Sequence, residues 1–183
     1  VKDMDIRKSP DAYSYFSIKN AWTMMRENGV VTLPVKNKDG CLEGIVTVGD
    51  IARIFMEMPD NRILAKARTQ YRQIAETIDG EIVVGDADAY FIKGKVNIGA
   101  AHLEIMREHV ERGDLVIMAN REEDQECVIR MGVSCIIICL GSQVSERIRL
   151  LAQQYNCVVI TSPLDTYTVA SSINQSIPIR HIM

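Results

Sequence analysis

The alternation of short apolar runs with helical segments after residue 60 constrains the fold of this chain most strongly. The apolar runs have the length and the β-branched content of buried strands, and the segments between them have helical periodicity. Because parallel strands need long crossover connections, typically helices, we predict an α/β domain with a largely parallel sheet, in two or three layers. The predicted strands are 81–84, 115–118, 135–140 and 158–161, and the predicted helices are about 64–78, 102–111, 125–131, 145–155 and 164–173.

The residues before 60 follow a different order of elements. An amphipathic helix comes first and ends at Asn28-Gly29, and two strands then flank a turn-forming sequence. The segment Met58-Pro59-Asp60-Asn61 breaks the pattern, so we predict a domain boundary near residue 60. The predicted elements are a helix over 17–29, strands over 30–35 and 42–47, a turn at 37–40, and a helix from Asp50 to about Met58.

The last predicted helix carries a capping signal. Ser162 is expected to cap it, Pro163 suits its first position, and Asp165 completes an S-x-x-D capping box. Capping alone explains these residues. The stretch that follows, 176–183, is too short to form a domain by itself.

Composition argues against several classes of function. Among 183 residues, 47% are hydrophobic, and 21 basic against 24 acidic residues leave a net charge of −3 without long like-charged runs. This balance disfavours a nucleic-acid partner. The apolar runs fall short of the ~20 residues that cross a bilayer, and the start lacks the pattern of a secretion signal. Five cysteines, an odd number, fit buried thiols in a reducing cytoplasm. From the start at Val1 we expect an excised piece of a longer chain.

Three sequence elements before residue 60 carry a family resemblance. They are Val1-x-Asp3-Met4, Ser17-Ile18-Lys19-Asn20-Ala21, and Leu33-Pro34-Val35 followed by Asp39-Gly40 and Gly44-Ile45-Val46-Thr47-x-x-Asp50-Ile51. With this spacing, residues 1–58 resemble a CBS domain, the nucleotide-sensing module named after cystathionine β-synthase. Ile179-Arg180-His181-Ile182-Met183 repeats the apolar, basic, polar, apolar order of the start, so residues 176–183 look like the opening of a second CBS domain.

The middle of the chain, 67–175, resembles a DRTGG domain and follows a predicted linker at 59–66. The resemblance lies in Leu115 to Glu122, in the apolar strand that runs into Gly141, and in Asp165-Thr166-Tyr167. The name-giving motif differs, because Asn120-Arg121-Glu122 replaces Asp-Arg-Thr and Cys139-Leu140-Gly141 replaces Thr-Gly-Gly. We therefore carry over the fold and no ligand site. In the family this domain links CBS units and forms dimer contacts, which implies a homodimer.

The order CBS, DRTGG, CBS is similar to the regulatory insert of CBS-containing family II inorganic pyrophosphatases. The resemblance implies binding of AMP, ADP, ATP or diadenosine polyphosphates, and control of pyrophosphate hydrolysis by catalytic DHH-type domains of the same chain. No DHH motif occurs here, so we expect no catalytic residue and no cofactor in this chain, and manganese or cobalt only in the catalytic domains. Three alternatives stay open: the sensor or dimerisation module of a CBS/DRTGG transcriptional regulator or another enzyme, a scaffold that has lost its ligand, and an independent α/β enzyme, which no residue pair at catalytic spacing supports.

The segment from Gly44 to Asp50 leaves a strand and enters a helix. Free backbone N–H groups and the positive end of the helix dipole are therefore expected to face a phosphate. The Thr47 hydroxyl can donate to a phosphate oxygen, and an ionised Asp50 can accept from both ribose hydroxyls, roles that the resemblance also assigns. The alternative is an ordinary strand threonine and an ordinary helix cap.

Further candidate residues are weaker. Lys36 neutralises a phosphate or is a solvated turn lysine, and Arg180 with His181 would lie beside base and phosphate in the second half-site. We predict no metal site, because two further pairs fit packing or solvent exposure better. These pairs are Cys135 with Cys139 on one strand face, and His102 with His109, seven apart on one helix.

Overall fold

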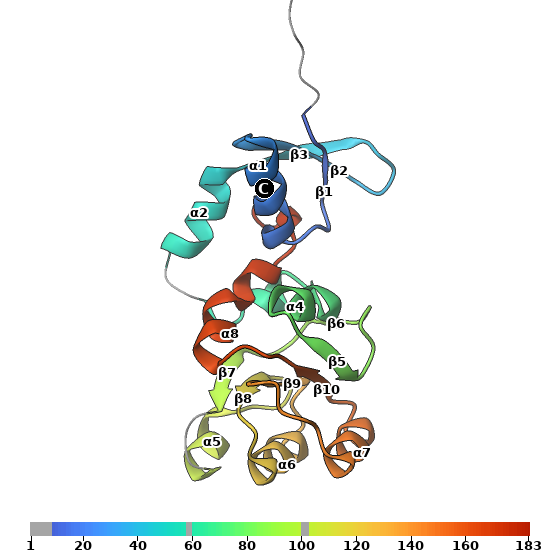
Figure 1. Ribbon diagram of the computed structural model, residues 1–183, viewed down its shortest axis with the longest axis vertical. Helices are drawn as coiled ribbons and strands as arrows, with labels where there is room; N and C mark the ends of the chain where they lie inside the picture. The colour runs from blue at the N-terminus through green and yellow to red at the C-terminus, as the bar shows by residue number, and fades with distance from the viewer. Residues whose placement is uncertain (1–8, 58–59, 100–102) are drawn as a thin grey trace, which may run out of the picture. The chain divides into compact units, whose positions relative to one another are not determined.

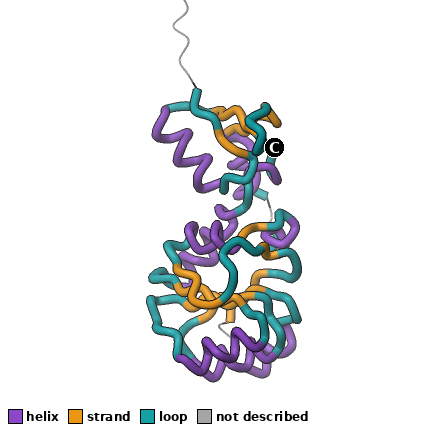
Figure 2. Tube along the Cα trace, turned by 90° about the vertical axis from the view of Figure 1, so that its right-hand side faces the viewer, coloured by secondary structure: helices purple, strands orange, loops and turns teal. Residues whose placement is uncertain are grey.

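The computed structural model describes residues 9–57, 60–99 and 103–183, in two compact units (Figures 1 and 2). The first unit takes the residues before Asp60 together with Pro178–Met183, and the second takes Asp60–Ile177. The predicted motif at Val1 to Met4 and the side chain of His102 lie outside the described residues.

The first unit is a small sheet with two helices. Its strands have the order β1-β2-β3, where β1 and β2 run parallel and β2 and β3 form an antiparallel hairpin. The hairpin prediction is confirmed, with the first strand shifted by two residues at its start. The elements are β1 (Ala12–Tyr13), α1 (Ile18–Asn28), β2 (Thr32–Lys36), β3 (Leu42–Thr47), α2 (Val48–Met56) and the 3-10 turn η2 (Ile179–His181).

Local sequence chemistry explains where these elements begin and end. The Ser17 side chain caps α1 by accepting from the Asn20 N–H at 3.1 Å, and Gly29 ends the helix in the left-handed conformation, with φ of 63°. In the hairpin turn, the Asn37 side-chain oxygen accepts from the N–H groups of Asp39 and Cys41, each at 2.9 Å. These bonds explain why the turn could be predicted from sequence.

The second unit contains a five-stranded sheet in the order β5-β10-β9-β8-β7. Strands β7 to β10 run parallel and β5 is antiparallel to β10, which confirms the predicted α/β fold with a largely parallel sheet. The strands are β4 (Thr69–Gln70), β5 (Glu81–Val84), β6 (Tyr90–Phe91), β7 (Val96–Gly99), β8 (Leu115–Met118), β9 (Cys135–Ile138) and β10 (Val158–Thr161). The helices are α3 (Ile63–Lys66), α4 (Tyr71–Thr77), α5 (Leu103–His109), α6 (Glu122–Arg130), α7 (Glu146–Gln154), α8 (Thr166–Ser172) and the 3-10 turn η1 (Ile173–Ser176).

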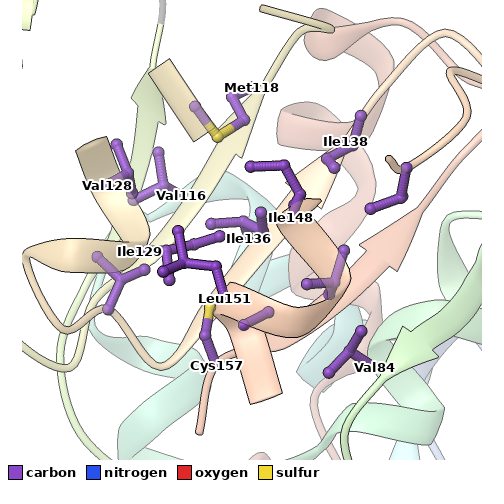
Figure 3. Packing of buried hydrophobic residues seen from close by; sticks show 14 of the residues in the cluster. Val84, Val116, Met118, Val128, Ile129, Ile136, Ile138, Ile148, Leu151 and Cys157 are labelled. Carbon is purple, nitrogen blue, oxygen red and sulfur yellow. The ribbon is translucent and has the colours of Figure 1, made fainter. Parts of the chain in front are cut away.

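Helices cover both faces of this sheet. Helices α5, α6 and α7 lie on one face, and α4 and α8 lie on the other (Figure 1). Between the sheet and α6 and α7, side chains of β8 and β9 pack against those of the two helices (Figure 3). Because both faces are covered, every position of β8 and β9 is buried, which explains why these strands appear in the sequence as continuous apolar runs. The labelled core residues include Val116, Met118, Ile136 and Ile138 from the strands and Val128, Ile129, Ile148 and Leu151 from the helices.

The predicted helix over 64–78 is wrong as a single element. Helices α3 and α4 are separated by Arg68, which has φ of 51°, and by Thr69, which pairs with Phe91 to form the small β4-β6 sheet. A residue in the left-handed conformation cannot continue an α-helix, so the chain turns there.

The predicted domain boundaries also change. Residues 60–66, predicted as part of a linker, fall in the second unit, and Leu64 of α3 is fully buried. At the other end, Ser176 and Ile177 stay with the second unit.

The predicted cap of the last helix is wrong as well. Helix α8 begins at Thr166, and its N-cap is Asp165, whose side chain accepts from the Thr168 N–H at 3.0 Å. The Ser162 hydroxyl instead donates to the buried Ile78 carbonyl at 2.7 Å. Ser162 therefore ties the end of β10 to the end of α4.

Candidate functional site

The turn between β3 and α2 holds the residues that the sequence singled out. Thr47 is the N-cap of α2, and Asp50 is the third helical residue, so Asp50 does not open the helix as predicted. The Asp50 N–H donates to Thr47 Oγ1 at 3.2 Å, and the Thr47 N–H donates to Asp50 Oδ2 at 2.9 Å. This reciprocal pair is a capping box, which explains why the helix starts here.

The same two side chains also bind each other directly. The Thr47 hydroxyl donates to Asp50 Oδ2 at 2.7 Å, and a hydroxyl has only one proton to donate. The Val48 N–H donates to the Val31 carbonyl at 3.0 Å. The predicted free donors are therefore already occupied at the hydroxyl and at the N–H groups of Thr47, Val48 and Asp50, because the T-x-x-D pattern closes on itself.

The Asp50 carboxylate is the main charged group of the turn. Hydrogen bonds from the Thr47 hydroxyl and N–H hold the pKa of Asp50 below its ordinary value of 3.8. Its second oxygen, Oδ1, lies 3.4 Å from the Arg53 guanidinium. An ionised carboxylate only accepts hydrogen bonds, so Oδ1 is suited to a ligand hydroxyl. Sequence reasoning missed Arg53, although an opposite charge three residues after Asp50 was a usable signal.

Gly44 lies on β3, opposite Val35. A Cβ atom added at Gly44 would lie 3.5 Å from the sulfur of Met183. This is an ordinary van der Waals distance, so Met183 packs beside Gly44 without requiring a glycine there. Gly44 does not have a positive φ either, so neither packing nor backbone conformation in this unit requires the glycine.

The segment Pro178–Met183, here called the return segment, packs on the first unit. The Ile179 N–H donates to the Phe16 carbonyl at 2.8 Å, and the Arg180 N–H donates to the Ser14 carbonyl at 3.0 Å. Ile179 is fully buried, whereas the side chains of Arg180 and His181 are exposed. The structure thus places these two predicted residues in the same unit as Thr47 and Asp50.

Lys36, at the end of β2, forms an ion pair with Asp11. This hydrogen-bonded carboxylate raises the pKa of Lys36 above its ordinary value of 10.5. In the structure, Lys36 is therefore a partly exposed lysine paired with a carboxylate.

The described residues also bear on metal binding and on membrane insertion. Within 9–57, 60–99 and 103–183, no three His, Cys, Asp or Glu side chains lie within reach of one metal ion. Cys135 and Cys139 are fully buried, and burial raises the pKa of both thiols. No helix in the described part of the chain combines the length and the apolar character needed to span a bilayer.

Comparison with known proteins identifies the two units. Residues 1–57 match the CBS domain and residues 73–176 match the DRTGG domain. Over 183 residues the chain is 31% identical to the cobalt-dependent inorganic pyrophosphatase of Clostridium perfringens, and over 187 residues it is 25% identical to the probable manganese-dependent inorganic pyrophosphatase of Thermotoga maritima. Each match covers 100% of this chain and 33% of the relative, so the chain spans about a third of the length of these relatives.

A solved structure at 32% sequence identity also covers the whole chain. It is the crystal structure of the CBS and DRTGG domains of the regulatory region of Clostridium perfringens pyrophosphatase, complexed with the activator diadenosine tetraphosphate. The TM-score is 0.94 and the sequence identity is 32%, with 100% of this chain and 80% of that chain covered. This chain therefore belongs to the DRTGG-domain family, carries a CBS domain before its DRTGG domain, and is homologous to the regulatory region of cobalt- and manganese-dependent inorganic pyrophosphatases.

Proposed function

We propose that this chain is a non-catalytic, adenine-nucleotide-binding region that regulates an inorganic pyrophosphatase. The observation that carries the proposal is the similarity, over the whole chain, to a regulatory region that was crystallised with diadenosine tetraphosphate. The catalytic domains would lie elsewhere in the same protein, because the relatives are about three times as long as this chain. Any manganese or cobalt would be held by those catalytic domains.

The proposed nucleotide site lies at the turn between β3 and α2. Asp50 Oδ1 would accept from a ribose hydroxyl in exchange for its contact with Arg53. Thr47 would donate to a phosphate only by releasing Asp50 Oδ2, so one charge-assisted hydrogen bond replaces another. At about 0.3 to 0.4 kcal/mol for each of about 23 heavy atoms, AMP binding is worth about 7 to 9 kcal/mol, which is micromolar affinity.

A complete cleft requires a second CBS unit. The first unit exposes large apolar side chains on both helices, Trp22 on α1 and Phe55 and Met56 on α2, with exposed fractions of 46%, 44% and 85%. Exposed apolar side chains of this size favour an interaction surface. We assign this surface to a second copy of the chain, which makes the regulatory region a homodimer with one half-site from each copy. A ligand with two adenosines then bridges two half-sites.

Regulation requires that the nucleotide bind one arrangement of the paired units more tightly than another. The phosphate charge near Thr47 and Arg53 would select that arrangement, with the DRTGG domain holding the dimer together. Arg180 and His181, exposed on the return segment of the same unit, supply further hydrogen-bonding groups for the phosphate chain, and Lys36 contributes only if it releases Asp11.

Calorimetric titration of AMP tests this proposal. The variants are Asp50→Ala and, as a control with the same charge change, Asp39→Ala in the exposed hairpin turn. We expect micromolar binding by the wild type and the control, and at least about tenfold weaker binding by Asp50→Ala, since hydrogen bonds to a charged group are worth about 1.5–3 kcal/mol. Equal affinity of the two variants would contradict the assigned site.

A second candidate function is favoured by the closed capping box. Because Thr47 and Asp50 satisfy each other, the CBS unit is also suited to act as a dimerisation scaffold without a ligand. Unchanged thermal stability in millimolar AMP, ADP and ATP would support the scaffold, since a ligand that binds the folded state raises its stability.

A further inference from the structure

Arg53 contacts both the Asp50 carboxylate, which is proposed to bind a ribose hydroxyl, and the return segment. Its Nη2 atom lies 3.4 Å from Asp50 Oδ1 and donates to the Ile182 carbonyl at 3.2 Å. Arg53 and Ile182 are 129 positions apart in the sequence, so this contact connects two distant parts of the chain. The Arg53 side chain is half exposed, at 55%, which leaves it free to move when a partner changes.

The return segment is the covalent continuation of the second unit. It follows Ile177, the last residue of that unit, and it ends in the first unit next to Gly44. Backbone hydrogen bonds from Ile179 and Arg180 and the burial of Ile182, which is 3% exposed, hold it there. A change in this segment is therefore a change in one of the two covalent connections between the CBS and DRTGG units.

The geometry makes the two Arg53 contacts interdependent. A long arginine side chain loses rotamer freedom when it is fixed, which opposes each contact that orders it. The Asp50 carboxylate offsets that loss and aims Nη2 at the Ile182 carbonyl. A ligand hydroxyl that takes the position of the Arg53 guanidinium at Asp50 Oδ1 leaves a single bond to a carbonyl to order the whole side chain.

We propose that Arg53 is a positioning residue that couples nucleotide binding at the Asp50 carboxylate to the attachment of the return segment to the first unit. The inference rests on the proposed function for its ligand. A nucleotide hydroxyl that binds Asp50 Oδ1 displaces the Arg53 guanidinium, and the hydrogen bond from Arg53 to the Ile182 carbonyl is weakened as a result. Coupling of this kind is reciprocal, so loosening the return segment also favours nucleotide binding.

The first experiment needs no ligand. Hydrogen exchange of the Ile179 and Arg180 amides, measured relative to the Ala21 amide of α1, reports local opening of the return segment. We expect exchange to be about three- to tenfold faster in Arg53→Ala and in Asp50→Asn, as loss of one modest hydrogen bond implies. Arg26→Ala, an exposed arginine in the same unit, is the matched control and should leave the ratio unchanged.

The double variant tests whether Asp50 affects the return segment only through Arg53. If Arg53 transmits the effect of Asp50, the Arg53→Ala/Asp50→Asn protein exchanges no faster than Arg53→Ala alone. Faster exchange in Arg53→Ala with no change in Asp50→Asn would overturn the coupling, because Arg53 would then hold the segment independently. If Arg53→Ala does not fold, Asp50→Asn still gives this comparison with the wild type.

The second experiment adds saturating AMP. We expect the wild-type return segment to exchange about three- to tenfold faster relative to Ala21, and Arg53→Ala to show no further change. Binding of AMP without this acceleration would overturn the coupling and leave the proposed function intact. If calorimetry shows no AMP binding, the proposed function fails. The ligand-free comparison of the variants still tests whether Arg53 links Asp50 to the return segment.

Discussion

Replacing Thr47 by alanine removes the hydroxyl at the centre of the capping box. The hydroxyl accepts from the Asp50 N–H at 3.2 Å and donates to Asp50 Oδ2 at 2.7 Å. Loss of a threonine N-cap costs about 1 kcal/mol, and the bond to a partly exposed carboxylate brings the expected loss to about 1 to 2 kcal/mol. With a urea dependence of about 1 kcal/mol per molar for a small unit, the unfolding midpoint should fall by about 1 to 2 M.

Tryptophan fluorescence isolates this effect. The only tryptophan of the sequence is Trp22 on α1, so urea unfolding followed at this residue, at one protein concentration for all variants, reports the first unit together with its proposed dimer surface. Thr47→Ser keeps the hydroxyl and should stay within about 0.5 kcal/mol of the wild type. Equal midpoints for Thr47→Ala and Thr47→Ser would refute the reasoning.

Acid provides a second check on the same variant. The pKa of Asp50 is lowered in the folded state, mainly by the Thr47 hydroxyl. The stability from this shift is therefore complete above the ordinary value of 3.8 and is lost as the pH falls through the lowered folded-state pKa. The stability difference between wild type and Thr47→Ala should be largest at neutral pH and should narrow on acidification below that value. A difference that is the same at neutral and acidic pH would contradict the assigned role of the hydroxyl.

Two predictions concern the second unit. Leu140 has φ of 67°, a conformation that costs about 1 to 2 kcal/mol for a residue with a side chain, so Leu140→Gly should raise the thermal unfolding midpoint followed by circular dichroism. The control is Leu150→Gly in helix α7, because Leu150 is 58% exposed and Leu140 is 60% exposed. The control should lower the midpoint, since glycine costs about 1 kcal/mol inside a helix. Asp114 is fully buried and accepts hydrogen bonds from the N–H groups of Lys95 and Glu111 and from the Asn97 amide at 2.6–2.9 Å. Asp114→Ala should therefore lower the free energy of unfolding in urea by about 3 kcal/mol or more. A loss below about 0.5 kcal/mol, as for a change at an exposed site, would contradict this role.

The strands of the parallel sheet could be predicted because burial leaves a clear pattern. The predicted bounds 115–118 and 158–161 agree with β8 and β10, whose positions are almost all buried. Strand β7 was missed, since it lies at the sheet edge, has no fully buried residue and contains Asn97. The two-residue strands β1, β4 and β6 are too short to show any period.

The helix errors have local causes that the sequence does not display. Nothing in its neighbours signals that Arg68 adopts a positive φ and divides the predicted helix. Helix α6 begins three residues before its predicted start at 125, because its first turn is acidic and carries no apolar period. At α8 the predicted cap was Ser162, but the helix begins at Thr166 with Asp165 as its N-cap, and Ser162 instead bonds to Ile78, a residue 84 positions away that no local pattern indicates.

The candidate site could be located from sequence but not described. The T-x-x-D pattern places Thr47 and Asp50 on one turn, and it does not tell whether they face a ligand or each other. The contact from Arg53 to Ile182 depends on the tertiary fold, because it joins residues 129 positions apart. The same holds for the packing of Met183 beside Gly44, which no local pattern predicts.

Nuclear magnetic resonance mapping of AMP on the isotope-labelled chain tests the central claim most directly. If the nucleotide binds at the turn between β3 and α2, the backbone amides from Gly44 to Arg53 should shift on titration, together with those of Arg180 and Ile182 on the return segment. The same titration of Asp50→Ala should need at least about tenfold more AMP to produce these shifts. Shifts confined to the residues of the second unit, or saturating shifts that are unchanged in Asp50→Ala, would contradict the account.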